Sequence, residues 1–235
     1  KEAKELVELA EAKGLFILEA ITVLHNAVFY EMKQNLAKLG PIRMVLANYS
    51  QYSSRYDNYL AGKVEHAFSR EYYGGALFDI NIYNVHYCVA LFGKPEAVSY
   101  YPNLGPNGID TSGTLVLSYP GFSAVCTGAK DSDSPCYVSV QGEQGWMKIN
   151  SKPNIAAQLT TIYTDPDNKA GAMVRATCEE SFQAPEQFHR MTQEFADFAR
   201  IIDTKDYAAA KALAQESLQV IEVLEEGRMK AGIEF

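Results

Sequence analysis

Three side chains that can give or accept a proton recur at helical spacing near the middle of the chain. Asp79, Tyr83 and His86 step by four and then three residues, so on a helix they would lie in one row. A carboxylate, a phenol and an imidazole in one row indicate acid–base chemistry on a small molecule. The same spacing is typical of a polar helix flank that only faces solvent, and spacing alone leaves both interpretations open.

One helix over residues 74–93 is predicted to carry this row. Gly74 and Gly75 precede it, and Gly93 supplies a stop. An apolar stripe follows the same helix at steps of four and three residues, formed by Phe78, Ile82, Val85, Val89 and Phe92. The proton-exchanging side chains would therefore lie beside a face that packs against a core.

Composition excludes several classes of protein. The 235 residues carry a formal net charge of −8, which argues against a nucleic-acid binder. No apolar run approaches the ~20 residues of a membrane span, and no secretory signal opens the chain. The four cysteines form no C-x-x-C pair, so we predict reduced thiols and a cytoplasmic protein. The histidines show no ligand spacing, and no metal site is expected.

The first twenty residues have the pattern of an α/β domain. Residues 1–13 are predicted to form an amphipathic helix that Gly14 ends. The apolar run Leu15 to Leu18 is typical of a strand buried on both faces of a parallel sheet. We expect these residues to be the last helix and strand of a domain whose remainder is absent from the sequence. A further helix is predicted from there to about Leu39.

Strands dominate the middle of the chain. The predicted strands cover residues 42–52, 111–119, 122–127, 136–140, 146–149, 156–164 and 173–179. Short turns join consecutive strands, which indicates a largely antiparallel sheet with helices over one face, an α+β fold. Two closing helices are predicted from one apolar stripe of Phe188, Met191, Phe195, Phe198 and Ile202, and another of Ala210, Leu213, Ser217, Val220 and Leu224.

A tyrosine-rich segment separates the first predicted strand from the central helix. Residues 49–59 contain four tyrosines and also Arg55 and Asp57. Tyrosines in such a segment can line a pocket for a hydroxylated ligand or form an interface. A packed surface loop is the simpler interpretation. Arg55 and Tyr56 are the candidates for ligand contact in this segment.

Several segments resemble the glucose–fructose oxidoreductase/inositol dehydrogenase/MocA family. They are Leu-Phe-Ile-Leu-Glu-Ala at 15–20, Gly-Gly-Ala-Leu-Phe-Asp at 74–79, Ile82-Tyr83, Val-Gln-Gly-Glu-Gln-Gly-Trp-Met-Lys-Ile at 140–149 and Glu216-Ser217. The resemblance runs in order through essentially the whole chain, and the 74–93 motif is the most specific part. Asn81 and Asn84 stand where relatives often have glycine and proline, which leaves the substrate's identity open.

The resemblance implies a two-domain oxidoreductase that uses NAD or NADP. Residues 1–20 would be the remnant of its N-terminal Rossmann domain. Residues 21–235 would be the substrate-binding and dimerisation domain, with a large antiparallel sheet like that of the C-terminal domain of glyceraldehyde-3-phosphate dehydrogenase. The sequence contains neither the family's glycine-rich fingerprint nor its Glu-Lys-Pro motif. Lys94-Pro95 and Lys152-Pro153 are not substitutes for that motif, since the first follows the central helix and the second lies in a strand-rich segment.

The resemblance also assigns roles on the central helix. Asp79 matches the family's acid and Tyr83 its proton-transfer position. The candidate substrate contacts are His86, Glu19, His25, Asn26, Arg55 and Tyr56, with Glu19 also a candidate contact to the cofactor. A tyrosine with a pKa near 10 is a poor base unless a cation lowers that pKa. The lysine of the missing motif would be that cation, so Tyr83 is expected to be largely inert without it.

Three functions remain open on the sequence. The first is the substrate domain of an NAD(P)-dependent oxidoreductase that acts on a sugar, polyol or related compound and is inactive as this fragment. The second is a cofactor-free module for ligand binding or self-association. The third is a hydrolase or isomerase that uses Asp79 and His86 without a cofactor. The family further implies a homodimer or higher homo-oligomer through the sheet, with no nucleic-acid or membrane partner.

Overall fold

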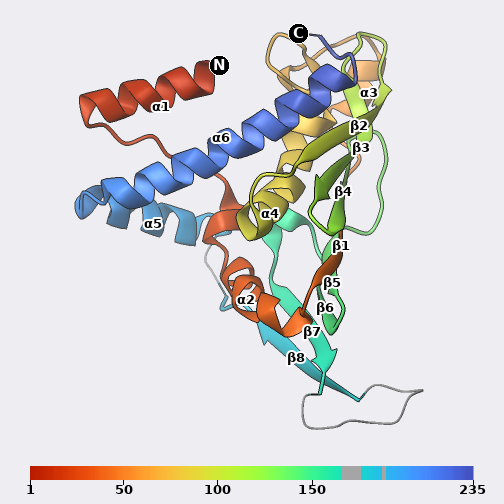
Figure 1. Ribbon diagram of the computed structural model, residues 1–235. Helices are drawn as coiled ribbons and strands as arrows, with labels where there is room; N and C mark the ends of the chain where they lie inside the picture. Colours follow the sequence, from red (N-terminus) through yellow and green to blue (C-terminus); the bar gives the residue numbers. More distant parts are fainter. Residues whose placement is uncertain (166–175, 187–188, 235) are drawn as a thin grey trace.

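One sheet of eight strands organises the part of the chain that the structure describes. The computed structural model describes residues 1–165, 176–186 and 189–234. The strand order is β2-β3-β4-β1-β5-β6-β7-β8 (Figure 1). The strands are β1 (Ile42–Ser50), β2 (Ala97–Leu104), β3 (Asp110–Tyr119), β4 (Phe122–Ala129), β5 (Tyr137–Gly142), β6 (Gly145–Ile149), β7 (Gln158–Thr164) and β8 (Thr177–Gln183). The β1–β4 pair is parallel and every other neighbouring pair is antiparallel, as the short turns predicted.

Helices cover one face of this sheet, which confirms the predicted α+β architecture (Figure 1). The α-helices are α1 (Glu2–Lys13), α2 (Ala27–Asn35), α3 (Tyr56–Leu60), α4 (Ile82–Phe92), α5 (Thr192–Asp203) and α6 (Tyr207–Lys230). Short 3-10 helices are η1 (Thr22–His25), η2 (Leu36–Leu39), η3 (His66–Phe68) and η5 (Pro153–Ile155). The core lies between the sheet and α2, α4 and α6. Leu115 and Leu117 of β3 point into it, and both are fully buried.

The central helix begins with a wide turn. Leu77–Asn81 is a π-helical turn (η4), and α4 continues from it to Phe92, where Gly93 ends the helix. The Asn81 amide donates to the Cys126 carbonyl oxygen at 2.9 Å, and the Asn84 amide donates to the Thr127 carbonyl oxygen at 2.9 Å. The helix is therefore tied by polar side chains to β4 as well as by the apolar side that periodicity predicted. Asp79 lies within the π-helical turn.

The predicted strand at Leu15 to Leu18 does not form. Residues 15–21 have no regular secondary structure, and Leu15 is 60% exposed. A strand of a parallel sheet needs a neighbouring strand to pair with, and none lies beside this segment in the described residues. Gly14 does end α1, in the left-handed conformation predicted for a helix stop.

The predicted helix that runs to Leu39 is divided at Asn26. Asn26 has an extended backbone, and its side chain accepts a hydrogen bond from the Val28 amide at 2.8 Å. This N-cap starts α2 and separates it from η1. The break leaves His25 and Asn26 at the junction, where they can face other elements.

The apolar stripe of α5 points outward rather than into the core. Phe195 is 60% and Ile202 is 47% exposed, whereas Glu194 and Ile201 are buried. Phe188 of that stripe and Met173 of the last predicted strand lie outside the described residues. The α6 stripe does face inward, with Ala210, Val220 and Leu224 buried.

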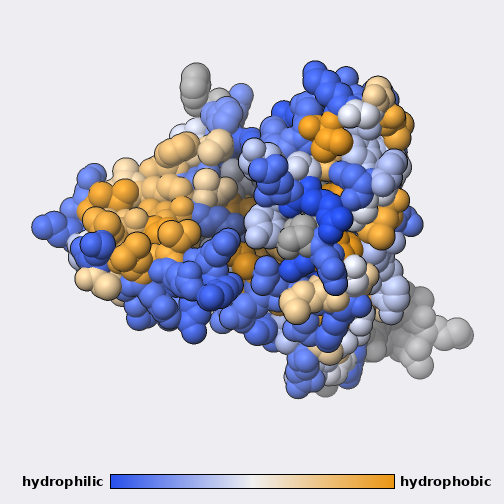
Figure 2. All heavy atoms as spheres, turned by 90° about the horizontal axis from the view of Figure 1, so that it is seen from above, coloured by the Kyte–Doolittle hydropathy of each residue, from blue (hydrophilic) through white to orange (hydrophobic). Residues whose placement is uncertain are grey.

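Exposed apolar side chains gather at the end of the molecule that carries α1, α5 and the start of α6 (Figures 1 and 2). The exposed members on these elements and on the segment after α1 are Leu6, Leu9, Leu15, Phe195, Ile202 and Tyr207. We call this set the apolar end. Contiguous apolar surface of this kind is typical of an interface.

Candidate active site

The carboxylate of Asp79 forms an ion pair with a buried lysine, Lys130. The Lys130 ammonium nitrogen lies 2.6 Å from Asp79 Oδ2, and the lysine side chain is only 2% exposed. Lys130 follows directly after β4, and this position places its ammonium group beside the start of the central helix. Burial lowers the pKa of Lys130, and the Asp79 charge acts against that shift. The side chain of Asp79 itself is 46% exposed and can reach a ligand.

Tyr83 has a different cation as its partner. The Arg190 guanidinium lies close to the Tyr83 hydroxyl group. Burial raises the pKa of Tyr83, and the Arg190 charge opposes that rise. The Tyr83 ring also packs edge-on against Tyr49 of β1, with ring centroids 5.8 Å apart. Burial raises the pKa of Tyr49 to about 12, so Tyr49 is a hydrogen-bonding group rather than a base.

A pocket with a mixed polar and apolar lining opens beside Arg190. Its volume is about 570 Å³, and its lining residues are Asn26, Ile155, Ala156, Ala157, Gln183, Ala184, Pro185, Glu186 and Arg190. Asn26 is fixed in this wall because its amide donates to the Ala156 carbonyl oxygen at 2.8 Å. The neighbouring Asn154 lies close to Tyr49. Amide and guanidinium groups in such a wall suit a ligand rich in hydroxyl groups.

A buried carboxyl group faces the same region. Glu194 on α5 is 1% exposed, and neither of its carboxylate oxygens has a hydrogen-bond partner among the described residues. Burial raises the pKa of Glu194, while the charges of His25 and Arg190 act to lower it. The His25 ring itself is bound to Asp197 Oδ2 at 2.7 Å. His25 therefore contributes to the packing of α5 against η1.

His86 lies between two glutamates. Its Nε2 atom is 3.4 Å from Glu19 Oε2, and its Nδ1 atom is 3.8 Å from Glu216 Oε1. The ring has no exposed surface. Burial acts to lower the pKa of His86, but the two glutamates outweigh it and the pKa is raised. Burial likewise acts to raise the pKa of Glu19, and His86 and Ser217 reverse that shift, so the pKa of Glu19 is lowered.

The structure does not place Asp79, Tyr83 and His86 in a single open row. Asp79 faces Lys130 and Tyr83 faces Arg190, whereas His86 joins the segment after α1 to α6. The hydrolase or isomerase interpretation needs Asp79 and His86 to act together, and this arrangement gives it no support.

Arg55 and Tyr56 belong to the tyrosine-rich segment beside Lys130. Arg55 Nε is bound to Glu65 Oε2 at 3.0 Å on the surface. The Tyr56 ring packs on the Phe68 ring, with centroids 5.7 Å apart. The two residues are thus engaged within the segment, and Arg55 affects the site through its charge near Lys130.

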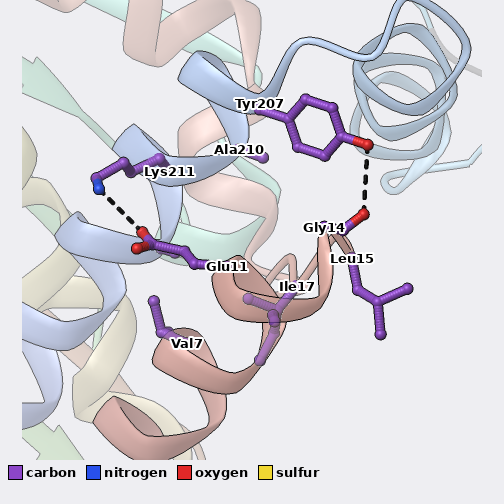
Figure 3. Close-up of a pocket in the computed structure, with 10 residues that line it drawn as sticks. Val7, Glu11, Gly14, Leu15, Ile17, Tyr207, Ala210 and Lys211 are labelled. Carbon is purple, nitrogen blue, oxygen red and sulfur yellow. Dashed lines mark hydrogen bonds and ion pairs between the residues drawn. The ribbon is translucent and has the colours of Figure 1, made fainter.

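A second hollow lies between α1 and α6. Figure 3 shows its lining, with Tyr207 bonded to the Gly14 carbonyl oxygen at 3.3 Å and Lys211 paired with Glu11 at 3.1 Å. Its volume is about 360 Å³, and most of its other lining residues are apolar, as are Val7, Leu15 and Ile17. The polar side chains of this hollow are paired between α1, or the Gly14 that ends it, and α6, so the hollow is part of how α1 packs on α6.

The described residues do not build a dinucleotide cradle. Such a cradle needs a glycine-rich turn between a strand and a helix, and residues 14–21 contain neither a strand nor a second glycine. No group of three or more metal-ligating side chains occurs in the described residues, and no helix there is long and apolar enough to cross a membrane.

Sequence reasoning missed Lys130, Arg190 and Glu194. Lys130 and Arg190 come from segments far along the chain from the central helix, and only the fold brings them to Asp79 and Tyr83. A lysine directly after the apolar strand that ends in Gly128-Ala129 was a usable signal. Arg190 lies in an irregular segment and carries no such signal.

Comparisons with known proteins place this chain in a family. The GFO/IDH/MocA C-terminal domain matches residues 31–148. The chain is 32% identical over 237 residues to scyllo-inositol 2-dehydrogenase (NADP(+)) IolU of Bacillus subtilis, covering 100% of the chain and 68% of that protein. It is 29% identical to the uncharacterized oxidoreductase YgjR of Escherichia coli, covering 86% of the chain and 58% of that protein. It is 33% identical to human trans-1,2-dihydrobenzene-1,2-diol dehydrogenase over 51% of the chain and 35% of that enzyme.

Solved structures share the fold. KijD10, a 3-ketoreductase from Actinomadura kijaniata in complex with NADP and TDP-benzene, matches with a TM-score of 0.74 and 16% identity, over 97% of this chain and 66% of that chain. The oxidoreductase yvaA of Bacillus subtilis matches with a TM-score of 0.70 and 17% identity, over 98% and 68%. The chain thus spans about two thirds of these proteins. The family expectation of NAD(P) is confirmed by the NADP-dependent name of IolU and by the NADP in KijD10.

Proposed function

The chain belongs to the GFO/IDH/MocA family, and from that premise we propose that it is the substrate-binding part of an NAD(P)-dependent oxidoreductase. Its substrate is a sugar, a polyol or a related hydroxyl or carbonyl compound. The observation that carries the proposal is the pairing of two proton-handling side chains, one turn apart, with two separate cations: Asp79 with Lys130 and Tyr83 with Arg190.

The chain's own residues handle the proton of the reacting hydroxyl. Tyr83 exchanges that proton, and the positive charge of Arg190 makes the phenolate form more accessible. The exposed carboxylate of Asp79 accepts a hydrogen bond from a substrate hydroxyl and so orients the reacting carbon. The polar side chains of the pocket beside Arg190 hold the remaining hydroxyl groups.

Residues 1–20 are proposed to belong to a dinucleotide-binding domain, and residues 21–235 to the substrate domain. The apolar end supports this division, because its leucines and phenylalanine need a covering surface. The uncovered third of IolU is large enough for such a domain. Without it the chain holds no dinucleotide and is inactive alone.

The test uses the full-length protein and the chain 1–235 side by side. Each is assayed with scyllo-inositol and with trans-1,2-dihydrobenzene-1,2-diol, the substrates in the names of the relatives, against NAD⁺ and NADP⁺. We expect reduction of the nicotinamide by the full-length protein on a polyol or diol, and none by the chain alone. No turnover by the full-length protein on these or a panel of sugars would refute the proposal.

A self-association role has its own support on the open face of the sheet. Met44 and Trp146 are 42% and 38% exposed there, and Leu46, Tyr137 and Lys148 line a shallow hollow beside Trp146. We propose that a homodimer forms through this face. Sedimentation of the full-length protein and of Trp146→Glu tests it, and dimers of equal stability in both would contradict it.

The four free cysteines are consistent with the proposed cytoplasmic location.

A further inference from the structure

Lys130, which is almost fully buried, forms an ion pair with Asp79, which is about half exposed. The Lys130 side chain is 2% exposed and that of Asp79 is 46% exposed, and Nζ lies 2.6 Å from Asp79 Oδ2. The buried ammonium group therefore holds the Asp79 carboxylate at Oδ2, while almost half of the Asp79 side chain stays exposed.

The lysine is fixed at both of its ends. Its backbone amide donates to the Thr111 carbonyl oxygen at 2.8 Å, and its carbonyl oxygen accepts from the Ser53 amide at 2.9 Å. Its ammonium group donates to the Ala67 carbonyl oxygen and lies 4.2 Å from the centroid of the Phe68 ring. The tyrosine-rich segment between β1 and the central helix thus supplies the groups that enclose the cation.

Stability does not account for this arrangement. Burying an ammonium group is costly, and apolar replacements of buried ion pairs are often neutral or stabilising. The charged groups around Lys130 are Asp79, Asp110 and Arg55. Burial and the Arg55 charge lower the pKa of Lys130, and the two aspartates oppose them. Apolar side chains in place of both Lys130 and its paired acid would avoid the cost of burying the ammonium group.

We propose that Lys130 is the positioning residue of Asp79: its ammonium group binds one carboxylate oxygen, fixes the carboxylate orientation and leaves the other oxygen to a substrate hydroxyl beside Tyr83. This inference rests on the proposed function, because Asp79 needs a fixed orientation only if it orients a substrate.

The first test compares Lys130→Met with Lys94→Met in the full-length holoenzyme. Lys94 pairs with Glu222 at 2.6 Å on the surface, so its replacement removes the same charge away from the site. With the best polyol and NADP⁺, we expect Lys130→Met to lower kcat about 10- to 100-fold, as misplacement of an orienting group does. The KM for NADP⁺ should stay within about twofold. Lys94→Met should leave both kcat and the KM for NADP⁺ unchanged.

A double-mutant cycle shows whether Lys130 acts through Asp79. Asp79→Asn is expected to lower kcat by itself. If Lys130 acts only by positioning Asp79, the double variant should have the kcat of Asp79→Asn within about twofold. Additive losses would mean that the two residues act independently, and that result would overturn the proposal.

An NMR titration gives a readout that does not need turnover. In protein labelled with [13Cε]lysine, the Lys130 resonance is recognisable by the ring-current shift of Phe68. The Asp79 charge raises the pKa of Lys130 against burial, so Asp79→Asn should move its titration to lower pH. An unchanged titration would overturn the proposal even if Lys130→Met fails to fold. A shifted titration in a protein inactive on every polyol would refute the proposed function and keep the Lys130–Asp79 coupling.

Discussion

The guanidinium group of Arg190, in the segment between β8 and α5, lies close to the hydroxyl group of Tyr83. This contact matters because Tyr83 is partly buried and burial alone makes its phenolate form costly. The resemblance to the family implies a lysine of an absent motif as the cation for this tyrosine. Arg190 supplies a positive charge to the phenol from the chain itself.

Replacing Arg190 should shift the pH dependence of the reaction. Arg190→Met removes the charge that opposes burial, so the pKa of Tyr83 rises further. If the phenolate is the active form, the limb of kcat/KM that increases with pH should move to higher pH. The measurement is a pH profile with saturating NADP⁺, supported by tyrosinate absorbance. Arg43→Met, which breaks a surface pair with Glu143, serves as the control. An unmoved limb would show that Arg190 does not act on Tyr83.

Replacing Tyr83 itself should remove the proton transfer. Tyr83→Phe keeps the ring contact with Tyr49 and deletes only the hydroxyl group. We expect kcat to fall about 100-fold or more, in the range of general acid–base effects, with little change in the KM for NADP⁺. Tyr30→Phe, at an exposed tyrosine on α2, is the matched control. Full dehydrogenation of scyllo-inositol by Tyr83→Phe would rule out the assigned role.

Periodicity could predict the helix that carries Asp79 and Tyr83, because apolar side chains at steps of three and four mark a packed face. It could not predict that His86 leaves the row. The π-helical turn at Leu77–Asn81 alters the phase of the helix, and Glu19 and Glu216 approach His86 from segments far away in the sequence. Such long-range partners depend on the fold and are invisible to local spacing.

His86→Gln should reduce stability most at mildly acidic pH. The pKa of His86 is raised in the folded state, so its contribution is complete below its ordinary value near 6.5 and is lost as pH rises through the raised value. The pKa of Glu19 is lowered, so its contribution is present above its ordinary value of 4.5 and is lost as pH falls. The difference from the unsubstituted protein should thus peak between about pH 5 and 6.5, at about 3 kcal/mol.

Urea unfolding at pH 5.5, 7.5 and 9 measures that difference. His66→Gln, at an exposed histidine in η3, is the control and should show no such pH dependence. A loss of stability of equal size at all three pH values would mean that the imidazole contributes through packing alone.

The apolar end should behave differently in the isolated chain and in the full-length protein. Leu6→Ser with Leu9→Ser removes two side chains that are 55% and 51% exposed here. In the chain 1–235 we expect a small change in unfolding free energy, within about 0.5 kcal/mol, and lower binding of a fluorescent hydrophobic dye. In the full-length protein the pair should cost several times more, since burying a leucine is worth about 2 kcal/mol. Leu60 on α3 is similarly exposed, and Leu60→Ser should change the unfolding free energy by the same amount in the chain 1–235 and in the full-length protein.

The contact between Asn81 and Gly128 should not tolerate a larger residue. A Cβ atom at Gly128 would lie 2.8 Å from the Asn81 Cβ atom, so Gly128→Ala overpacks the junction of the π-helical turn and β4. We expect a loss of about 1–3 kcal/mol in thermal or urea unfolding. Gly14→Ala is a poor control because of its left-handed backbone, whereas Ser123→Ala on the exposed part of β4 is suitable. An unchanged stability would mean that β4 can shift at Gly128.

The exposed apolar stripe of α5 shows a second property that the sequence could not predict. An amphipathic pattern establishes that one face is apolar, but it does not name the surface that covers it. Phe195 and Ile202 are exposed in this chain, and Glu194 occupies the inner face. Likewise the run Leu15 to Leu18 has the composition of a buried strand, but a strand forms only beside a partner.

The place of β1 in the sheet has a consequence for how the protein folds. The strands β2, β3 and β4 form one meander of local contacts, and β5 to β8 form another. β1 joins them, with Ala47 opposite Cys126 on one side and Leu46 opposite Ser139 on the other. Both pairings close long loops, whose entropy cost must be met before the contacts form. Each meander can therefore assemble early, and docking of both on β1 should limit the folding rate.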